Sequence, residues 1–224
     1  MSETSEQLIT VSNPRSPIAE AYRTLRTNIQ FSSLDRPLQT LLVTSTTPEE
    51  GKSTTLANLA VTFAQAGHRV ILVDADLRRP MLHKLFGLPN SIGLTSLFIA
   101  DAPGSLPLQE TEVPNLMLLP SGPQPPNPSE LLGSQRMDKV IAALKEASDY
   151  VLFDCPPIIA VTDAAVLGRK VDGVLLVVSA GKTKRDHAAR AKLLLEKVNA
   201  NLLGVVLTNA KLDMRLYQYY TQGR

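Results

Sequence analysis

One segment combines glycine, lysine and hydroxyl side chains at a spacing that suits phosphate binding. The run Thr46–Thr54, TTPEEGKST, follows an apolar stretch and precedes a segment with helical periodicity. It matches the pattern G-x-x-x-x-G-K-[ST] at Gly51, Lys52 and Ser53, although Thr46 stands at the first glycine position. Successive backbone N–H groups at a helix N-terminus form a concave site for anions. The segment therefore predicts a phosphate-binding loop for a nucleotide.

Each residue type in this loop has an expected task. Gly51 lets the backbone approach the phosphates, Lys52 reaches the β- and γ-phosphates, and Ser53 Oγ ligates Mg²⁺. The alternative is a plain strand-to-helix turn with a surface lysine, which the flanking strand and helix disfavour. We expect ATP and Mg²⁺ as ligands, with ATP contacted by Thr47, Pro48, Glu49, Glu50, Gly51, Lys52, Ser53 and Thr54.

Carboxylates end two of the apolar runs. Asp74 and Asp76 close RVILVDAD, and Asp154 closes YVLFD. In an open parallel sheet, ligands bind beyond the carboxyl ends of the strands, where all three side chains are expected. One of Asp74 and Asp76 would anchor the metal, and the other would accept a proton from a nucleophile near the γ-phosphate. Asp163 and Asp172 are interpreted as helix caps or turn formers.

Short apolar runs alternate with helical segments along the chain. Near-continuous apolar strands between helices predict a parallel sheet covered on both faces. The fold class is therefore α/β, a three-layer P-loop NTPase fold with a mostly parallel sheet. The expected strands are Thr40–Ser45, Arg69–Asp74, Asn115–Pro120, Tyr150–Asp154, Gly173–Ser179 and Leu202–Thr208. Helical periodicity covers Ser53–Gly67, Met137–Ser148 and Thr183–Val198.

Bulk properties limit the functional classes. The 224 residues suit a single domain over 1–224, with an N-terminal helix at about 17–32 and a flexible polar tail at about 211–224. The net charge of +2 is not gathered into one run, so no nucleic-acid partner is expected. A single cysteine, Cys155, is interpreted as a packed side chain in a reducing cytoplasm. No apolar stretch is long enough for a membrane span.

Three motifs in order, TTPEEGKSTT, VILVDADLRRP and YVLFDCPPI, resemble the Walker A, A′ and B motifs of the bacterial tyrosine kinases (BY-kinases) that partner polysaccharide co-polymerases. EAYRTLRTN and SGPQPPNPSELL extend the resemblance over nearly the whole chain. It implies ATP-dependent autophosphorylation that regulates capsular or exopolysaccharide synthesis and export. The implied catalytic residues are Lys52, Asp74 and Asp76, and the implied magnesium ligands are Ser53, Asp74 and Asp154.

The same resemblance implies an assembly. The family pattern E-x-x-R-x-x-R falls on Glu20, Arg23 and Arg26, which would contact a neighbouring subunit in a ring-like homo-oligomer. A transmembrane activator or polysaccharide co-polymerase would recruit the cytoplasmic kinase to the inner face of the membrane, and a tyrosine phosphatase would reverse it. The implied phosphate acceptors are the tail residues Tyr217, Tyr219 and Tyr220.

One departure and two rival functions accompany this interpretation. Glu49 stands where the family often has glycine, and a carboxylate there disfavours ATP unless it faces away or meets a cation. The first rival is an ATPase switch of the partitioning or septum-site type, although such loops usually carry a second lysine where this chain has Thr47. The second is an ATP-gated scaffold without kinase activity.

Overall fold

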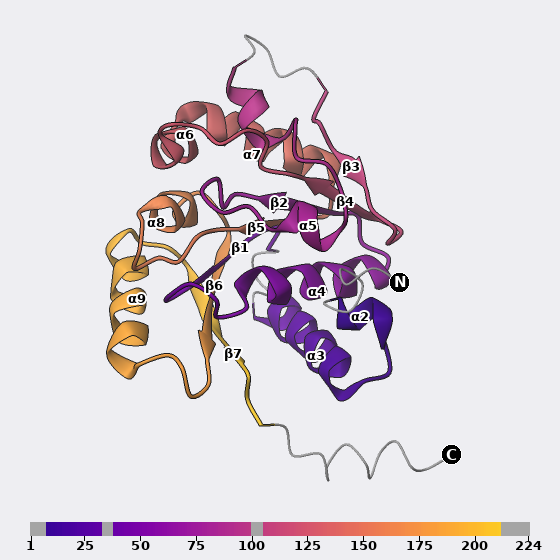
Figure 1. Ribbon diagram of the computed structural model, residues 1–224, viewed down its shortest axis with the longest axis vertical. Helices are drawn as coiled ribbons and strands as arrows, with labels where there is room; N and C mark the ends of the chain where they lie inside the picture. The colour runs from indigo at the N-terminus through magenta and orange to yellow at the C-terminus, as the bar shows by residue number, and fades with distance from the viewer. Residues whose placement is uncertain (1–7, 33–37, 100–104, 212–224) are drawn as a thin grey trace.

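The computed structural model describes residues 8–32, 38–99 and 105–211, which form one seven-stranded sheet between two layers of helices (Figure 1). The strand order is β3-β4-β2-β5-β1-β6-β7. Every pairing is parallel except that of β3 with β4. The strands are β1 (Thr40–Ser45), β2 (Val70–Asp74), β3 (Gln109–Glu110), β4 (Leu116–Leu119), β5 (Tyr150–Asp154), β6 (Gly173–Ser179) and β7 (Leu202–Thr208). The predicted fold class is confirmed.

All six predicted strands are present. Four have the predicted bounds at both ends, β2 is shorter by one residue at its start, and β4 is shorter by one residue at each end. The seventh strand, β3, was not predicted, because two residues are too few to carry a periodic pattern. It is also the antiparallel strand at one edge of the sheet.

The helices divide between the two faces of the sheet (Figure 1). One face carries α2 (Ile9–Ser12), α3 (Pro17–Phe31), α4 (Lys52–Gln65) and α5 (Leu82–Leu85). The other carries α6 (Pro128–Gly133), α7 (Gln135–Ala147), α8 (Asp163–Gly168) and α9 (Arg185–Lys197). A 3₁₀ segment, η1, spans Leu94–Phe98. The long helices lie where periodicity predicted them, whereas the short α2, α5, α6 and α8 were not predicted.

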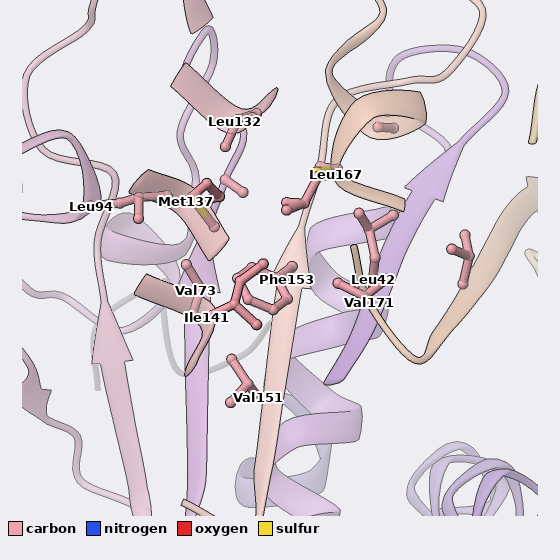
Figure 2. Close-up of a cluster of buried hydrophobic side chains, with 14 of the residues drawn as sticks. Leu42, Val73, Leu94, Leu132, Met137, Ile141, Val151, Phe153, Leu167 and Val171 are labelled. Atoms are coloured by element: carbon pink, nitrogen blue, oxygen red, sulfur yellow. The ribbon is translucent and has the colours of Figure 1, made fainter. Parts of the chain in front are cut away.

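The core is double because the central strands are buried on both faces. In β1, Leu42 packs toward α7 and α8, whereas its neighbours Leu41 and Val43 pack toward α4. Figure 2 shows the first of these cores, in which Phe153 of β5 lies beside Ile141 of α7. This alternation explains why the strands appear in the sequence as continuous apolar runs.

The sheet order determines which strand ends meet. Strand β5 lies between β1 and β2, and its register pairs Asp154 with Asp74. The phosphate loop follows β1 on the other side of β5. The loop and the two carboxylates therefore lie together at the carboxyl edge of the sheet, where parallel α/β folds bind ligands.

Within the described ranges, none of the helices is both long and apolar enough to cross a bilayer.

Candidate active site

The phosphate loop connects β1 to α4 and leaves the start of that helix open. Gly51 is the residue before α4, and its φ of 87° lies in the left-handed region that glycine adopts without strain. No side chain caps α4. The first N–H groups of an α-helix have no partner within the helix, so these donors face outward with the positive end of the helix dipole. The backbone is thus arranged for an anion, as predicted.

Lys52 lies at the centre of the acidic residues. Its Nζ is 2.9 Å from Asp76 Oδ2 and 3.2 Å from both carboxylate oxygens of Asp154. It also donates to Ser53 Oγ at 3.1 Å, and Ser53 Oγ in turn donates to Asp154 Oδ2 at 2.5 Å. The structure therefore brings together Lys52, Ser53, Asp76 and Asp154, which the sequence places in three separate motifs.

Asp74 is the third aspartate of this cluster. Its side chain is fully buried, and Oδ2 accepts hydrogen bonds from the N–H groups of Met81 and Leu82 at 3.0 and 2.9 Å. Oδ1 has no partner among the described residues. Burial, followed by the nearby charge of Asp154, raises the pKa of Asp74 to about 8. Asp74 is therefore protonated at neutral pH in the absence of ligands.

The charges of Asp154 and Lys52 shift each other's pKa. Burial raises the pKa of Asp154 above its usual range, although Lys52 and Ser53 counteract the shift. Burial alone would lower the pKa of Lys52, but the carboxylates of Asp154 and Asp76 more than reverse this and raise it. Three carboxyl groups against one ammonium leave the site with surplus negative charge at high pH. Such a site favours an added cation.

The oxygen ligands fit Mg²⁺ by type and position. Ser53 Oγ lies against Asp154, and Asp74, the register partner of Asp154, has one oxygen without a partner among the described residues. Mg²⁺ prefers hard oxygen ligands and usually takes one or two carboxylates together with substrate phosphates and waters. No cage of three or more acidic, histidine or cysteine side chains is found in the described ranges, and this mode of binding needs none.

Glu50, predicted among the ATP contacts, has its side chain inside the protein. It is 1% exposed and accepts hydrogen bonds from N–H and Oγ1 of both Thr46 and Thr47, and from Thr183 Oγ1. Burial would raise the pKa of Glu50, but the hydrogen bonds, led by that from Thr183, lower it overall. The sequence around Glu50 does not predict the hydrogen bond from Thr183, because Thr183 is 133 residues away.

The sequence indicated that a carboxylate at Glu49 disfavours ATP unless it faces away or meets a cation, and the structure places a cation beside it. Its side chain is 88% exposed and lies 3.6 Å from Lys182 Nζ, which also donates to the Glu49 carbonyl at 3.1 Å. The carboxylate thus faces solvent beside a cation. The φ of 61° is left-handed, which explains why glycine suits this position.

Two cavities flank the loop and share Glu49, Gly51 and Thr54. The first, of about 590 Å³, is lined by Lys52, Asp76, Met81, Pro156, Pro157 and Val161 among others. The second, of about 760 Å³, lies between α3 and β7 and is lined by Ile18, Tyr22, Leu25, Val206 and Asn209 among others. Lys52 and Asp76 line the first cavity and not the second, so the two cavities differ in chemistry.

Asp163 and Asp172 accept hydrogen bonds that hold separate segments of the chain together. Arg78, in the segment after Asp76, forms a two-point ion pair with Asp163 at 2.9 and 3.0 Å, and Ser129 donates to the same carboxylate. The sequence predicted a structural role for Asp163 but not this partner. Asp172 accepts from the N–H groups of Gln39 and Thr40 at 3.1 and 2.8 Å, as a turn-forming residue does.

The E-x-x-R-x-x-R residues lie on α3, and all three are engaged within the protomer. Arg23 pairs with Glu20 at 2.8 Å and donates to the Pro14 carbonyl at 2.7 Å. Arg26 Nη1 donates to the Thr62 carbonyl at 2.7 Å and so ties α3 to α4. The predicted acceptors Tyr217, Tyr219 and Tyr220 lie outside the described residues. Cys155 is fully buried, as predicted.

Comparisons with known proteins agree with this site. Residues 41–221 match the model of the CobQ/CobB/MinD/ParA nucleotide binding domain. The tyrosine-protein kinase YwqD of Bacillus subtilis is 46% identical over 98% of this chain and 93% of its own length. The putative tyrosine-protein kinase CapB of Staphylococcus aureus is 41% identical over 94% and 92%. The crystal structure of the chimerical protein CapA2B2 superposes with a TM-score of 0.86 at 40% identity, covering 90% of this chain and 89% of that one. This chain therefore belongs to the bacterial tyrosine-protein kinases, within the CobQ/CobB/MinD/ParA class of nucleotide-binding domains.

Proposed function

We propose that this kinase transfers the γ-phosphoryl group of ATP to the C-terminal tyrosines of a neighbouring copy of the chain, and thereby regulates capsular or exopolysaccharide synthesis and export. The observation that carries the proposal is Lys52, placed between Asp76 and Asp154 at the open start of α4. A cation, an uncapped helix and buried carboxylates are the components that phosphoryl transfer requires.

ATP binding follows from the loop. The outward-facing N–H groups at the start of α4 hold phosphate oxygens, and the Lys52 ammonium offsets their charge. Ser53, Asp74 and Asp154 would hold Mg²⁺, which would neutralise the charge that develops on the phosphates during transfer. A bound metal ion would favour the ionised form of Asp74, whose pKa burial and the charge of Asp154 raise to about 8.

The different positions of Asp74 and Asp76 support a division of their tasks. Asp76 lines the first cavity together with Lys52, whereas Asp74 is fully buried beneath it. We therefore assign Asp76 as the group that accepts the tyrosine hydroxyl proton, and Asp74 as the metal ligand. The tyrosine oxygen forms a bond to the γ-phosphorus, the bond from that phosphorus to the β–γ bridging oxygen breaks, and ADP leaves.

The two cavities have different occupants in this scheme. Pro156, Pro157 and Met81 give the first cavity apolar walls beside Asp76, which suits the ring of an incoming tyrosine. The nucleoside must extend away from the acidic side chains, and the cavity between α3 and β7 is the one on the other side of the loop. Burial raises the pKa of the Tyr22 hydroxyl in this cavity, and Thr55 of α4 partly counteracts the shift.

Assembly completes the scheme. A neighbouring subunit would deliver Tyr217, Tyr219 and Tyr220 to the first cavity, with Glu20 and Arg23 of α3 at the subunit interface of a ring. Glu20 is more than half exposed and its pairing with Arg23 leaves it at the surface, which supports this use. A transmembrane activator would bring the kinase to the inner face of the membrane, and a tyrosine phosphatase would reset it.

The test is the intact mass of the purified protein after incubation with MgATP. We expect added phosphate in the wild type, none in Lys52→Met, and none in the triple variant Tyr217→Phe, Tyr219→Phe, Tyr220→Phe. Lys139→Met, an exposed change on α7, serves as the charge-matched control. ADP formed without phosphoprotein, also in the presence of the activator's cytoplasmic segment, would replace the kinase by an ATPase switch.

A further inference from the structure

The phosphate loop is divided into two halves that use their backbone donors differently. In the first half, the N–H groups of Thr46 and Thr47 donate to Glu50 Oε2 at 2.8 and 3.1 Å. In the second half, Gly51 precedes α4, which has no side-chain cap. An anion from within the chain therefore satisfies the first half, and the second half stays available for phosphate.

We infer that Glu50 is a positioning residue that shapes the phosphate loop before ATP arrives, and that it sets the affinity for ATP rather than the rate of phosphoryl transfer. This inference rests on the proposed binding of ATP at the loop. Glu50 is 1% exposed and lines the second cavity rather than the first, so its carboxylate acts through the backbone that it holds.

The contacts of Glu50 reach three separate parts of the fold. Its Oε1 accepts from Thr183 Oγ1 at 2.5 Å, which fastens the loop after β6, and Thr183 Oγ1 also accepts from the Ser179 N–H at 2.8 Å. The Glu50 carbonyl accepts from Thr208 Oγ1 at 2.8 Å, at the end of β7. The phosphate loop is thus anchored to two neighbouring strand ends through one residue.

Charge explains why a glutamate is needed here. A carboxylate offers two acceptor oxygens and no donor, and here every group directed at those oxygens is an N–H or O–H donor. A glutamine of the same shape replaces one oxygen by an NH₂ group, which either meets the two backbone N–H donors or turns the three threonine hydroxyls into acceptors. In both cases the hydrogen bonds to a charged acceptor are lost, the loop is held less firmly, and ATP must restore its shape on binding.

The experiment compares ATP binding by calorimetry, and KM with kcat, for wild type, Glu50→Gln and the exposed control Glu146→Gln on α7. We expect Glu50→Gln to weaken ATP binding by about 10-fold or more and to raise KM in parallel, with kcat changed by no more than about threefold. Glu146→Gln should match the wild type. A simple folding defect would instead lower kcat by reducing the active fraction, with KM unchanged.

A second pair of variants keeps the test decisive if Glu50→Gln does not fold. Thr183→Val removes one donor to Glu50, and Thr183→Ser retains it. We expect Thr183→Val to weaken ATP binding by about threefold, and Thr183→Ser to restore it. In the double variant Glu50→Gln, Thr183→Val, the second change should add nothing, because both act through one contact.

Three outcomes would overturn the inference: equal ATP affinity for Glu50→Gln and wild type, equal affinity for Thr183→Val and Thr183→Ser, or multiplicative effects in the double variant. A wild type that binds no ATP would instead refute the proposed function on which the inference rests. The two failures are therefore distinguishable.

Discussion

Glu50 and Asp74 are both buried acidic residues of the same site, yet the pKa of Glu50 is lowered and the pKa of Asp74 is raised. Glu50 is 1% exposed, and its pKa is lowered because backbone and side-chain donors surround both oxygens. Asp74 is fully buried, and burial, followed by the charge of Asp154, raises its pKa to about 8, because donors at only one of its oxygens do not offset these effects. Burial sets the cost of a charge, and the number of donors decides whether that cost is met.

The opposite pKa shifts of Glu50 and Asp74 suit two different roles. A carboxylate with every lone pair engaged is a fixed structural anion, so Glu50 suits the shaping of a loop. A carboxyl group with a vacant oxygen and a raised pKa is ready to exchange its proton for a cation, so Asp74 suits metal binding. Four substitutions test this contrast.

The largest effect should come from Lys52→Met, which removes the cation that Asp76 and Asp154 share. We expect phosphoryl transfer to fall by about 10³-fold or more, because the charge that offsets the phosphates is lost. The unpaired buried carboxylates should also cost about 3–5 kcal/mol of unfolding free energy in metal-free buffer at pH 8. Urea unfolding, with Lys139→Met as the control, measures this cost. Equal stability of Lys52→Met and wild type would show that the aspartates are not charged in the metal-free protein.

The next effect is expected from Glu50→Gln. At pH 7 it should lower the unfolding free energy by about 2–3 kcal/mol, since hydrogen bonds to a charged acceptor are lost and donors are left facing an amide. The folded pKa of Glu50 is lowered, so its stabilisation is present above the unfolded value of about 4.3 and is lost as pH falls through the folded value. The difference between variant and wild type should therefore shrink below about pH 4. A difference that stays constant down to pH 3 would assign the effect to packing.

Asp74→Asn should show the opposite dependence. Between about pH 4 and pH 8 the native state holds a proton on Asp74 that the unfolded chain has released, so wild-type stability falls as pH rises. The slope approaches about 1.4 kcal/mol per pH unit and levels off above pH 8. The asparagine variant should lack this slope in buffer containing a chelator, and the difference curve removes the titrations that both proteins share. Parallel curves from pH 5 to pH 8 would contradict the raised pKa.

The smallest effect concerns Glu49, the exposed neighbour of Glu50. Glu49→Gly should stabilise the fold by about 0.5–1 kcal/mol, because glycine adopts the left-handed φ of 61° without strain. ATP affinity should rise by about two- to threefold, since a carboxylate near the phosphates is removed. Lys182→Gln, measured beside it, isolates the surface ion pair, which is expected to contribute about 1 kcal/mol or less. A destabilised Glu49→Gly would mean that the ion pair outweighs the backbone strain.

Much of the site could be predicted from local sequence, and the reason is physical. The glycine, lysine and serine of the phosphate loop must be consecutive, because one turn of backbone holds the anion. Asp74, Asp76 and Asp154 each follow an apolar run, and the carboxyl ends of parallel strands lie at one edge of the sheet. The structure confirms that these residues meet, and their roles in catalysis stay predictions.

Other features lay beyond any local pattern. The order in which β5 lies between β1 and β2 makes Asp154 the neighbour of both Lys52 and Asp74. The short strand β3 pairs only because β4 is already in place, and nothing in its two residues indicates this.

The sequence by itself determined the class of fold and the chemistry of the loop, because periodicity and consecutive residue types are local properties of the chain. The tertiary structure decided how each acidic residue behaves. Glu50 becomes a structural anion through Thr183, which is 133 residues away, and Asp74 becomes a weak acid because it is buried and its register places it beside Asp154. Acidity depends on the donors and charges within a few ångströms, and only folding brings those together.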